Sequence, residues 1–204
     1  MDGAAASALP VAAGLLTATL ALLMALIAFG NITDFGTNQA FVRHVLAMDT
    51  TFKDPDLMWR AITSHTLQDL AYVAIIAWET LAALVLIAAC AVWLRDGRRR
   101  AGNARARQLG TYGLLMVLLL FGAGFMAVGG EWFAMWQSKD WNGLEAATRN
   151  FLLAAATLIL LHLPGAATRS ESDAGNEAGN EAGSGAGDDT ESARIPQPQS
   201  RESQ

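Results

Sequence analysis

Four stretches of this chain carry almost no charge, and each is about as long as a helix needs to cross a lipid bilayer: residues 9–30, 70–94, 109–130 and 146–163. The first and third contain no charged residue, the second contains only Glu79, and the fourth contains only Arg149. A helix of about 20 residues spans the roughly 30 Å hydrocarbon core of a bilayer. We therefore predict an all-α fold, a four-helix transmembrane bundle.

Composition agrees with a membrane protein. The chain is 52% hydrophobic and only 16% charged, whereas a soluble domain has about 25% charged residues. Residues 1–7 contain no Lys or Arg, and the following apolar run is longer than the about 7–15 residues of a signal peptide. We expect the first helix to be retained, within an integral membrane domain of residues 1–164. In the fourth span, we expect Arg149 and Asn150 to lie at the membrane interface.

The acidic residues are concentrated in the C-terminal tail. Residues 165–204 hold three Arg and eight Asp or Glu, which accounts for the whole net charge of −5. The segment Ala174–Glu177 repeats as Ala178–Glu181, and the remainder is rich in Gly, Ser and Asp. Such a composition has too little apolar surface to offset the entropy of ordering, so we predict a disordered tail.

Six arginines in residues 95–107 predict the orientation. The positive-inside rule places this loop in the cytoplasm, and four spans then place both termini there. Residues 31–69 and the segment before the fourth span face the periplasm in this prediction. The predicted location is a bacterial inner (plasma) membrane, with several passes. No aromatic residue is interleaved with the arginines, so we expect lipid contact and no nucleic-acid partner.

The two periplasmic segments contain distinctive patterns. Residues 39–48 have apolar side chains at helical spacing (Phe41, Val42, Val45, Leu46 and Met48), which predicts a short amphipathic helix on the outer membrane surface. Residues 57–62 are predicted to form a second short amphipathic segment. Residues 129–143 hold three of the six tryptophans. Because tryptophan prefers the boundary between lipid and water, this segment is predicted to lie there.

Glu79 is the residue most suggestive of chemistry. It lies about 13 Å into the second span at 1.5 Å per residue, where a carboxylate costs several kcal/mol unless it is paired, hydrated or protonated. Glu79 could carry protons, form half of a buried pair, or only fix helix packing. A basic partner would have to come from Arg43, Arg60 or Lys139, which lie in the outer segments.

Other features are weaker indications. His44 and Met48 share a helical face, and His with Met can bind copper or haem iron. The single cysteine, Cys90, reads as a small buried apolar residue. Glycines at 122, 124, 129 and 130 would let another helix approach closely. We find no recognised catalytic motif, so we expect no enzyme activity, no metal and no cofactor.

Five motifs of the chain together resemble a known family: NITD at 31–34, FVRHVLAMDTTF at 41–52, WRAI at 59–62, AWE at 77–79 and GGEWFAMWQSKDWNG at 129–143. They are similar to those of a bacterial family of predicted small integral membrane proteins without an assigned function. The resemblance covers residues 10–164. It implies four membrane helices and a plasma-membrane location, and it implies no activity, cofactor or site residue.

The charged and aromatic residues of these motifs are predicted to form one cluster that closes the periplasmic side of the bundle. Its members are Arg43, His44, Asp49, Trp59, Arg60, Trp78, Glu79, Glu131, Trp132, Trp136, Lys139 and Trp141. The leading hypothesis is an accessory or assembly subunit in the lipid bilayer, whose cluster binds a membrane-protein partner, a second copy or a lipid. The alternatives are a redox, quinone or haem-associated subunit with Glu79 as proton site, and a small oligomeric transporter.

Overall fold

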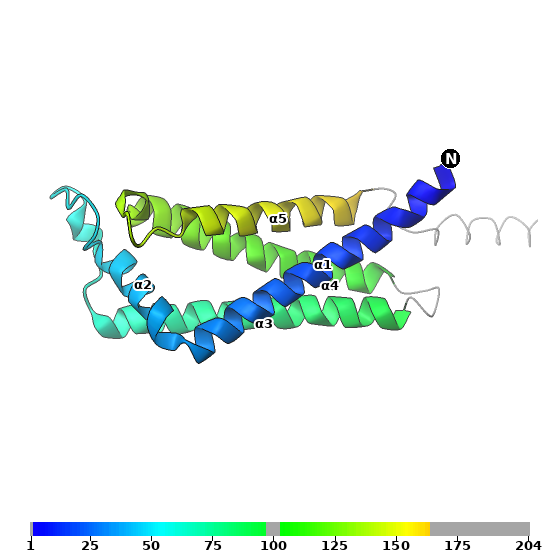
Figure 1. Ribbon diagram of the computed structural model, residues 1–204, viewed down its shortest axis with the longest axis horizontal. Coiled ribbons are helices and arrows are strands. Elements are labelled where there is room, and N and C mark those ends of the chain that lie inside the picture. The colour runs from blue at the N-terminus through cyan, green and yellow to red at the C-terminus, as the bar shows by residue number, and fades with distance from the viewer. Residues whose placement is uncertain (1, 97–102, 164–204) are drawn as a thin grey trace, which may run out of the picture. The chain divides into compact units, whose positions relative to one another are not determined.

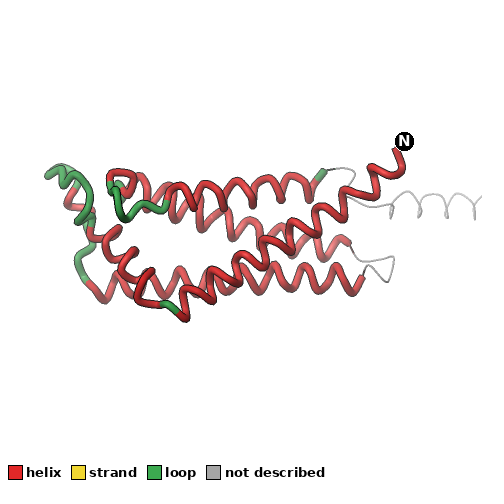
Figure 2. Tube along the Cα trace, viewed as in Figure 1, coloured by secondary structure: helices red, strands yellow, loops and turns green. Residues whose placement is uncertain are grey.

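The computed structural model describes residues 2–96 and 103–163, and within these ranges the chain forms helices and connecting turns (Figures 1 and 2). The elements are α1 (Asp2–Thr33), α2 (Phe35–Ala47), η1 (Met58–Arg60), α3 (His65–Asp96), α4 (Asn103–Leu118), η2 (Leu119–Trp132), η3 (Met135–Gln137) and α5 (Leu144–His162). The prediction of an all-α fold is confirmed. Residues 97–102 of the arginine loop and the tail predicted to be disordered lie outside the described residues.

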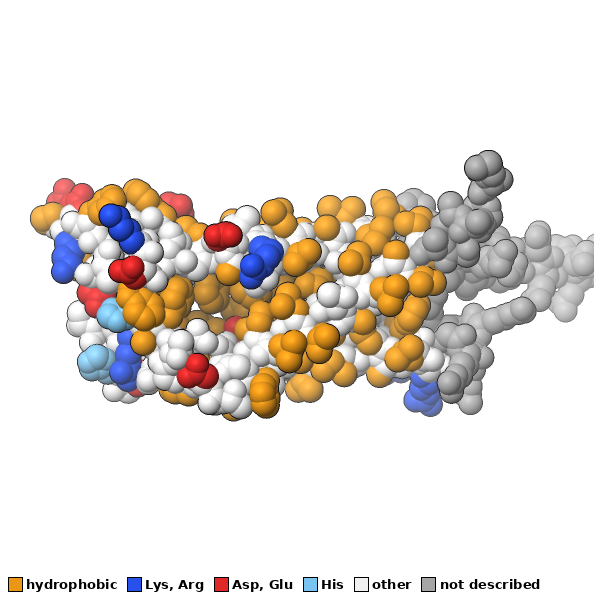
Figure 3. Space-filling view, in the orientation of Figure 1, with side chains coloured by type: hydrophobic (Ala, Val, Ile, Leu, Met, Phe, Trp, Pro, Cys, Tyr) orange, Lys and Arg blue, Asp and Glu red, His pale blue; other side chains and the backbone are white. Residues whose placement is uncertain are grey.

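Four helices are long and apolar enough to span a membrane, as predicted: Leu9–Thr33, His65–Arg95, Ala104–Trp132 and Leu144–His162. The helices of the first three spans (α1, α3 and α4 with η2) extend past both ends of the runs that predicted them, and the fourth begins two residues before its run and ends one residue short of it. Figure 3 shows a broad apolar band around the middle of the visible face, with the charged side chains gathered mainly toward one end. A charge-poor belt of this kind suits contact with lipid.

The third span changes its helical geometry halfway along. It runs as an α-helix through α4 and then as a π-helix through η2. The last hydrogen bond of the π type joins Phe133 N to Val128 O at 3.0 Å.

Two of the four glycines predicted to allow close helix packing lie directly against α5. A Cβ atom at Gly122 would lie 2.8 Å from the Phe151 ring, and one at Gly130 would lie 2.9 Å from the Leu144 side chain.

The buried apolar side chains of residues 2–96 and 103–163 form two separate cores. The larger core lies between the spans and includes the fully buried side chains of Met24, Leu86, Leu114 and Val117. The smaller core joins Val45, Met48, Phe133, Ala134 and Met135 at one end of the bundle. We call this end, made of α2 with residues 48–64 and 133–143, the cap.

α2 replaces the predicted short helix at 39–48 and begins four residues earlier. α2 follows α1 after an elbow beside Asp34 (Figure 1). It then packs along α3 and runs toward the first residues of that helix. Its apolar side, with Val42 and Val45, is buried against the rest of the protein. Met48 ends the helix in the left-handed conformation, at φ 53°. The position of α2 relative to a periplasmic membrane surface stays a prediction.

Candidate functional site

The predicted cluster is divided among several places. Ten of its members lie in the cap or at the adjoining end of η2, whereas Trp78 and Glu79 lie inside α3. Glu79 is 14 residues from His65, the first residue of α3, which separates it from the cap end of that helix by about 21 Å. The helical rise thus places Trp78 and Glu79 deeper in the bundle than the other ten, although Asn31 and Asn38 link Glu79 to α2 by hydrogen bonds. That the twelve residues act as one cluster stays a prediction. Whether any of the twelve residues binds a ligand stays a prediction.

Arg43 fastens α2 to α3. Its Nε and Nη2 donate to the two carboxylate oxygens of Asp69, at 2.8 Å each, and Gln39 adds a third bond to Asp69 at 2.9 Å. The hydrogen bond to Asp69 raises the pKa of Arg43 above its ordinary value. A bidentate pair of this kind sets the orientation of both partners. Sequence reasoning assigned no role in the cluster to Asp69, because its partner is 26 residues away.

His44 forms the second charged contact of the cap. Its Nδ1 lies 2.8 Å from Asp49 Oδ2, and its ring stacks on Trp141 with centroids 4.5 Å apart. The neighbouring Phe41 also contacts Trp141, with centroids 6.3 Å apart. His44 thus joins α2 to the tryptophan-rich segment. Met48, which shares a helical face with His44 in the sequence, is 1% exposed and belongs to the cap core.

Arg60 lies between two tryptophan rings. Its guanidinium carbon is 4.8 Å from the centroid of Trp132 and 5.6 Å from that of Trp59. The two rings meet edge to face, 5.6 Å apart. Trp59 remains 70% exposed and Trp132 45% exposed. We call these three residues the Trp–Arg–Trp surface; cation–π contact with both rings orients the arginine while much of each ring stays accessible.

A third part of the cap joins residues 50–52 to the tryptophan-rich segment. Thr50 donates to the hydroxyl of Ser138 at 2.9 Å, and the backbone N–H of Phe52 donates to Gln137 Oε1 at 2.9 Å. Phe52 and Trp136 meet edge to face at 6.0 Å. Lys139 and Glu131, the remaining predicted members, are exposed and form no ion pair with another described residue.

Glu79 occupies a buried polar position in the bundle. It is 2% exposed, and its Oε2 accepts a 2.6 Å hydrogen bond from Asn31 Nδ2. Asn38 Nδ2 donates in turn to Asn31 Oδ1 at 2.6 Å, and the hydroxyl of Tyr72 donates to the backbone carbonyl of Asn31 at 3.1 Å. A chain of amides therefore leads from exposed Asn38 on α2 to the buried carboxylate.

None of the three basic residues considered from the sequence lies at Glu79. Arg43 is bonded to Asp69, Arg60 contacts tryptophans, and Lys139 is exposed. The partner is Asn31, which the sequence placed at the end of the first span without a link to Glu79. Trp78, the neighbour of Glu79, donates its indole N–H to the Met116 carbonyl at 3.0 Å and is 39% exposed.

Asn150 on α5 is a second buried polar residue, which the sequence predicted to lie at the interface. Arg149 is exposed, but Asn150 is only 4% exposed, because consecutive helical residues point about 100° apart. Its Oδ1 is sealed from solvent and accepts no hydrogen bond. Buried polar atoms are nearly always hydrogen-bonded, so this exception calls for an explanation.

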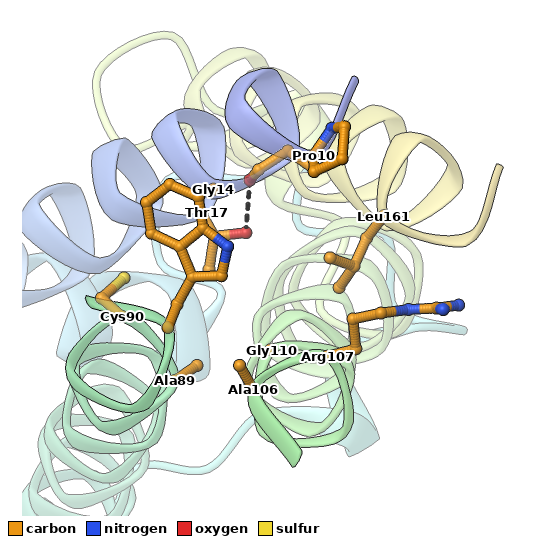
Figure 4. A pocket seen from close by; sticks show the side chains of 11 residues that line it. Pro10, Gly14, Thr17, Ala89, Cys90, Ala106, Arg107, Gly110 and Leu161 are labelled. Atoms are coloured by element: carbon orange, nitrogen blue, oxygen red, sulfur yellow. Dashed lines mark hydrogen bonds between the residues drawn. The ribbon is translucent and has the colours of Figure 1, made fainter. Parts of the chain in front are cut away.

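The end of the bundle opposite the cap has an apolar pocket, lined in part by Cys90 and Trp93 of α3 (Figure 4). The hydroxyl of Thr17 is already bonded to the Ala13 carbonyl at 2.8 Å. The side chain of Arg107 points away from the pocket (Figure 4). The pocket therefore offers little beyond packing. No group of three or more His, Cys, Asp or Glu side chains in the described ranges is arranged to hold a metal.

Comparison with known proteins identifies one match. Residues 9–164 match the model of a family described as "Predicted small integral membrane protein (DUF2165)". No curated protein and no solved structure matches the chain. The matched region contains all four spans, the cap and Glu79.

Proposed function

The chain belongs to this family of small integral membrane proteins, and from that membership and the geometry of the cap we propose that it is a non-enzymatic accessory subunit. In this proposal the Trp–Arg–Trp surface binds the extramembrane part of another protein in a bacterial inner membrane. The observation that carries the proposal is that Arg60 contacts the rings of both Trp59 and Trp132, which orients them, while both rings stay exposed.

The residue types favour protein binding. Tryptophan and arginine are the side chains most concentrated in the energetic centres of protein interfaces. A side chain that is held in place before binding loses less entropy when the partner arrives. Trp59 and Trp132 are held in place by contact with Arg60. Each also keeps about half or more of its surface accessible to a partner.

Position also favours a protein partner over an aromatic belt in lipid. Trp59 belongs to the segment that precedes α3 and projects past the ends of the helices (Figure 1). The cap end of α3 is about 21 Å from Glu79 along the helix axis. Half of a hydrocarbon core is only about 15 Å, so a bilayer centred near Glu79 would leave this surface outside the acyl chains.

The proposal is tested by purifying the tagged protein in mild detergent from the membranes of its own organism. We expect a partner in a fixed ratio to the chain, quantified by mass spectrometry. The double variant Trp59→Ala/Trp132→Ala should lower partner recovery at least tenfold. Trp136→Ala is the matched control, because Trp136 is 50% exposed in the same cap but lies outside the Trp–Arg–Trp surface. Equal recovery from all three proteins, or no partner in a fixed ratio, would overturn the proposal.

A small oligomeric transporter is the second candidate function. The observation that favours it is Glu79, an acid inside the bundle whose bonded partner, Asn31, carries no charge. Intramembrane acids often mark the paths of ions or substrates. In a redox subunit that binds a quinone, Glu79 would serve as the proton site.

A further inference from the structure

No basic side chain of the described residues forms an ion pair with the Glu79 carboxylate. The ion pairs among described residues join Arg43 to Asp69 and His44 to Asp49, both in or beside the cap. Asn31, the residue bonded to Glu79, is neutral. A carboxyl group inside a membrane bundle needs a counter-charge, water or a bound proton, and a positively charged ligand is one group that would satisfy this position.

The carboxylate is held in place at one oxygen and open at the other. Asn31 fixes Oε2, and Asn31 is itself held by Asn38 and Tyr72. Among the described residues Oε1 accepts no hydrogen bond, yet it is not among the buried atoms sealed from solvent. Oε1 therefore faces space that a small polar group can reach, and it can act only as an acceptor when the carboxylate is ionised.

Asn150 contributes a second acceptor at a similar depth. Phe151, its neighbour, packs on Gly122 of η2, and Trp78, the neighbour of Glu79, bonds to Met116 of α4. These contacts place Asn150 and Glu79 within about two turns of each other along the third span. Oδ1 of Asn150 is sealed from solvent, whereas Nδ2 forms no hydrogen bond with a described residue and is not among the sealed atoms. A ligand N–H group would therefore reach the Asn150 acceptor when the side-chain amide turns over, which exchanges its oxygen and nitrogen positions.

An opening leads toward this part of the bundle. Figure 3 shows a hollow in the visible face, between the α1–α2 elbow and α5. The elbow carries Asn31 and Asn38, so the hollow lies beside the chain of amides that ends at Glu79. Three phenylalanine rings form a run of contacts between α2 and the third span: Phe41 stacks on Phe125 at 6.5 Å, and Phe121 lies 5.6 Å from Phe125.

We propose that the space between α1, α3 and α5 beside Glu79 binds an ammonium group carried on an apolar body. The ammonium N–H groups would bond to Glu79 Oε1 and to the Asn150 carbonyl, while the apolar part would lie among the phenylalanine rings. Two acceptors without a competing cation select a donor that carries positive charge. The aromatic faces suit the same ligand through cation–π attraction. This site is separate from the Trp–Arg–Trp surface and does not depend on a partner protein.

The test uses 2-phenylethylammonium as probe and the full-length protein in lipid nanodiscs, with binding followed by isothermal titration calorimetry. Saturable binding is expected, and Glu79→Gln should weaken it at least tenfold. The glutamine carbonyl can still accept from Asn31, so this variant should fold. Asn150→Leu should weaken binding about fivefold. Asp140→Asn, which changes an exposed acid of the cap, should bind within twofold of the unmodified protein.

Several outcomes would contradict the proposed site. Absence of saturable binding would overturn the proposal, as would equal binding by Glu79→Gln or by Asn150→Leu. Circular dichroism and thermal melting establish that each variant is folded; if Glu79→Gln does not fold, Asn150→Leu decides alone. Equally tight binding of the uncharged 2-phenylethanol would show that charge plays no part and would also contradict the proposal.

Discussion

At the scale of single residues, the bond between Asn31 and Glu79 joins the end of α1 to the buried part of α3. Asn31 donates to a carboxylate that is 2% exposed, and it also accepts from Asn38. Hydrogen bonds to charged groups contribute about 1.5–3 kcal/mol each. Removal of the asparagine leaves the buried carboxyl group without its donor, and an unsatisfied polar group inside a protein costs more than the net contribution of the bond itself.

Asn31→Leu should therefore lower the free energy of unfolding by about 1.5–3 kcal/mol. Addition of Glu79→Leu to that variant should restore part of the loss, since the buried charge is then removed as well. Denaturant unfolding of both single variants and the double variant in detergent gives the coupling energy of the pair. Additive effects of the two substitutions would show that the bond contributes nothing measurable.

At the scale of elements, close approach of α5 to η2 holds the fourth span in the bundle. The two helices meet at Gly122, where a Cβ would lie 2.8 Å from the Phe151 ring. At Gly124 an added Cβ would meet nothing nearer than 3.9 Å. In a bilayer such contacts are stabilised by van der Waals packing, because lipid tails are as apolar as the helix surfaces.

Gly122→Ala should destabilise the protein by about 1–3 kcal/mol through overpacking against Phe151. Gly124→Ala, two residues away in the same helix, should be neutral or slightly stabilising because alanine has the lower entropy cost of folding. Thermal or denaturant unfolding of the two variants compares them directly. The account of this interface fails if both substitutions have the same effect.

The attachment of α2 to α3 depends on the pair of Arg43 with Asp69. Asp69→Asn removes the charge but nearly keeps the shape, so the overall fold should persist. We expect faster hydrogen exchange in α2, with no change for amides near Leu86 in the middle of α3, because local opening depends on local contacts. Unchanged exchange in α2 would show that the pair does not hold the helix.

At the scale of the whole molecule, the spans were predictable and the side-chain partnerships were not. Long runs without charge identify membrane helices, because length and hydropathy alone decide insertion. Asn31 and Glu79 are 48 residues apart and Arg43 and Asp69 are 26 apart, and no local pattern joins such pairs. The depth of Glu79 in α3 follows from helix length, but its link to α2 through Asn31 and Asn38 had no signal in the sequence.

The orientation of the protein remains open to a labelling experiment. In a Cys90→Ser background, Lys53→Cys places a thiol on the exposed part of the cap. The positive-inside rule predicts that a membrane-impermeant maleimide labels this position in intact cells whose outer membrane has been made permeable. Labelling only after disruption of the inner membrane would reverse the predicted orientation.

The central claim is that the Trp–Arg–Trp surface contacts a protein and not lipid. A photoreactive phenylalanine analogue at position 59, activated in native membranes, tests this most directly, with the same analogue at position 136 as control. The account predicts one discrete protein adduct from position 59 and none of that mass from position 136. Adducts with lipid alone, or the same adducts from both positions, would contradict it.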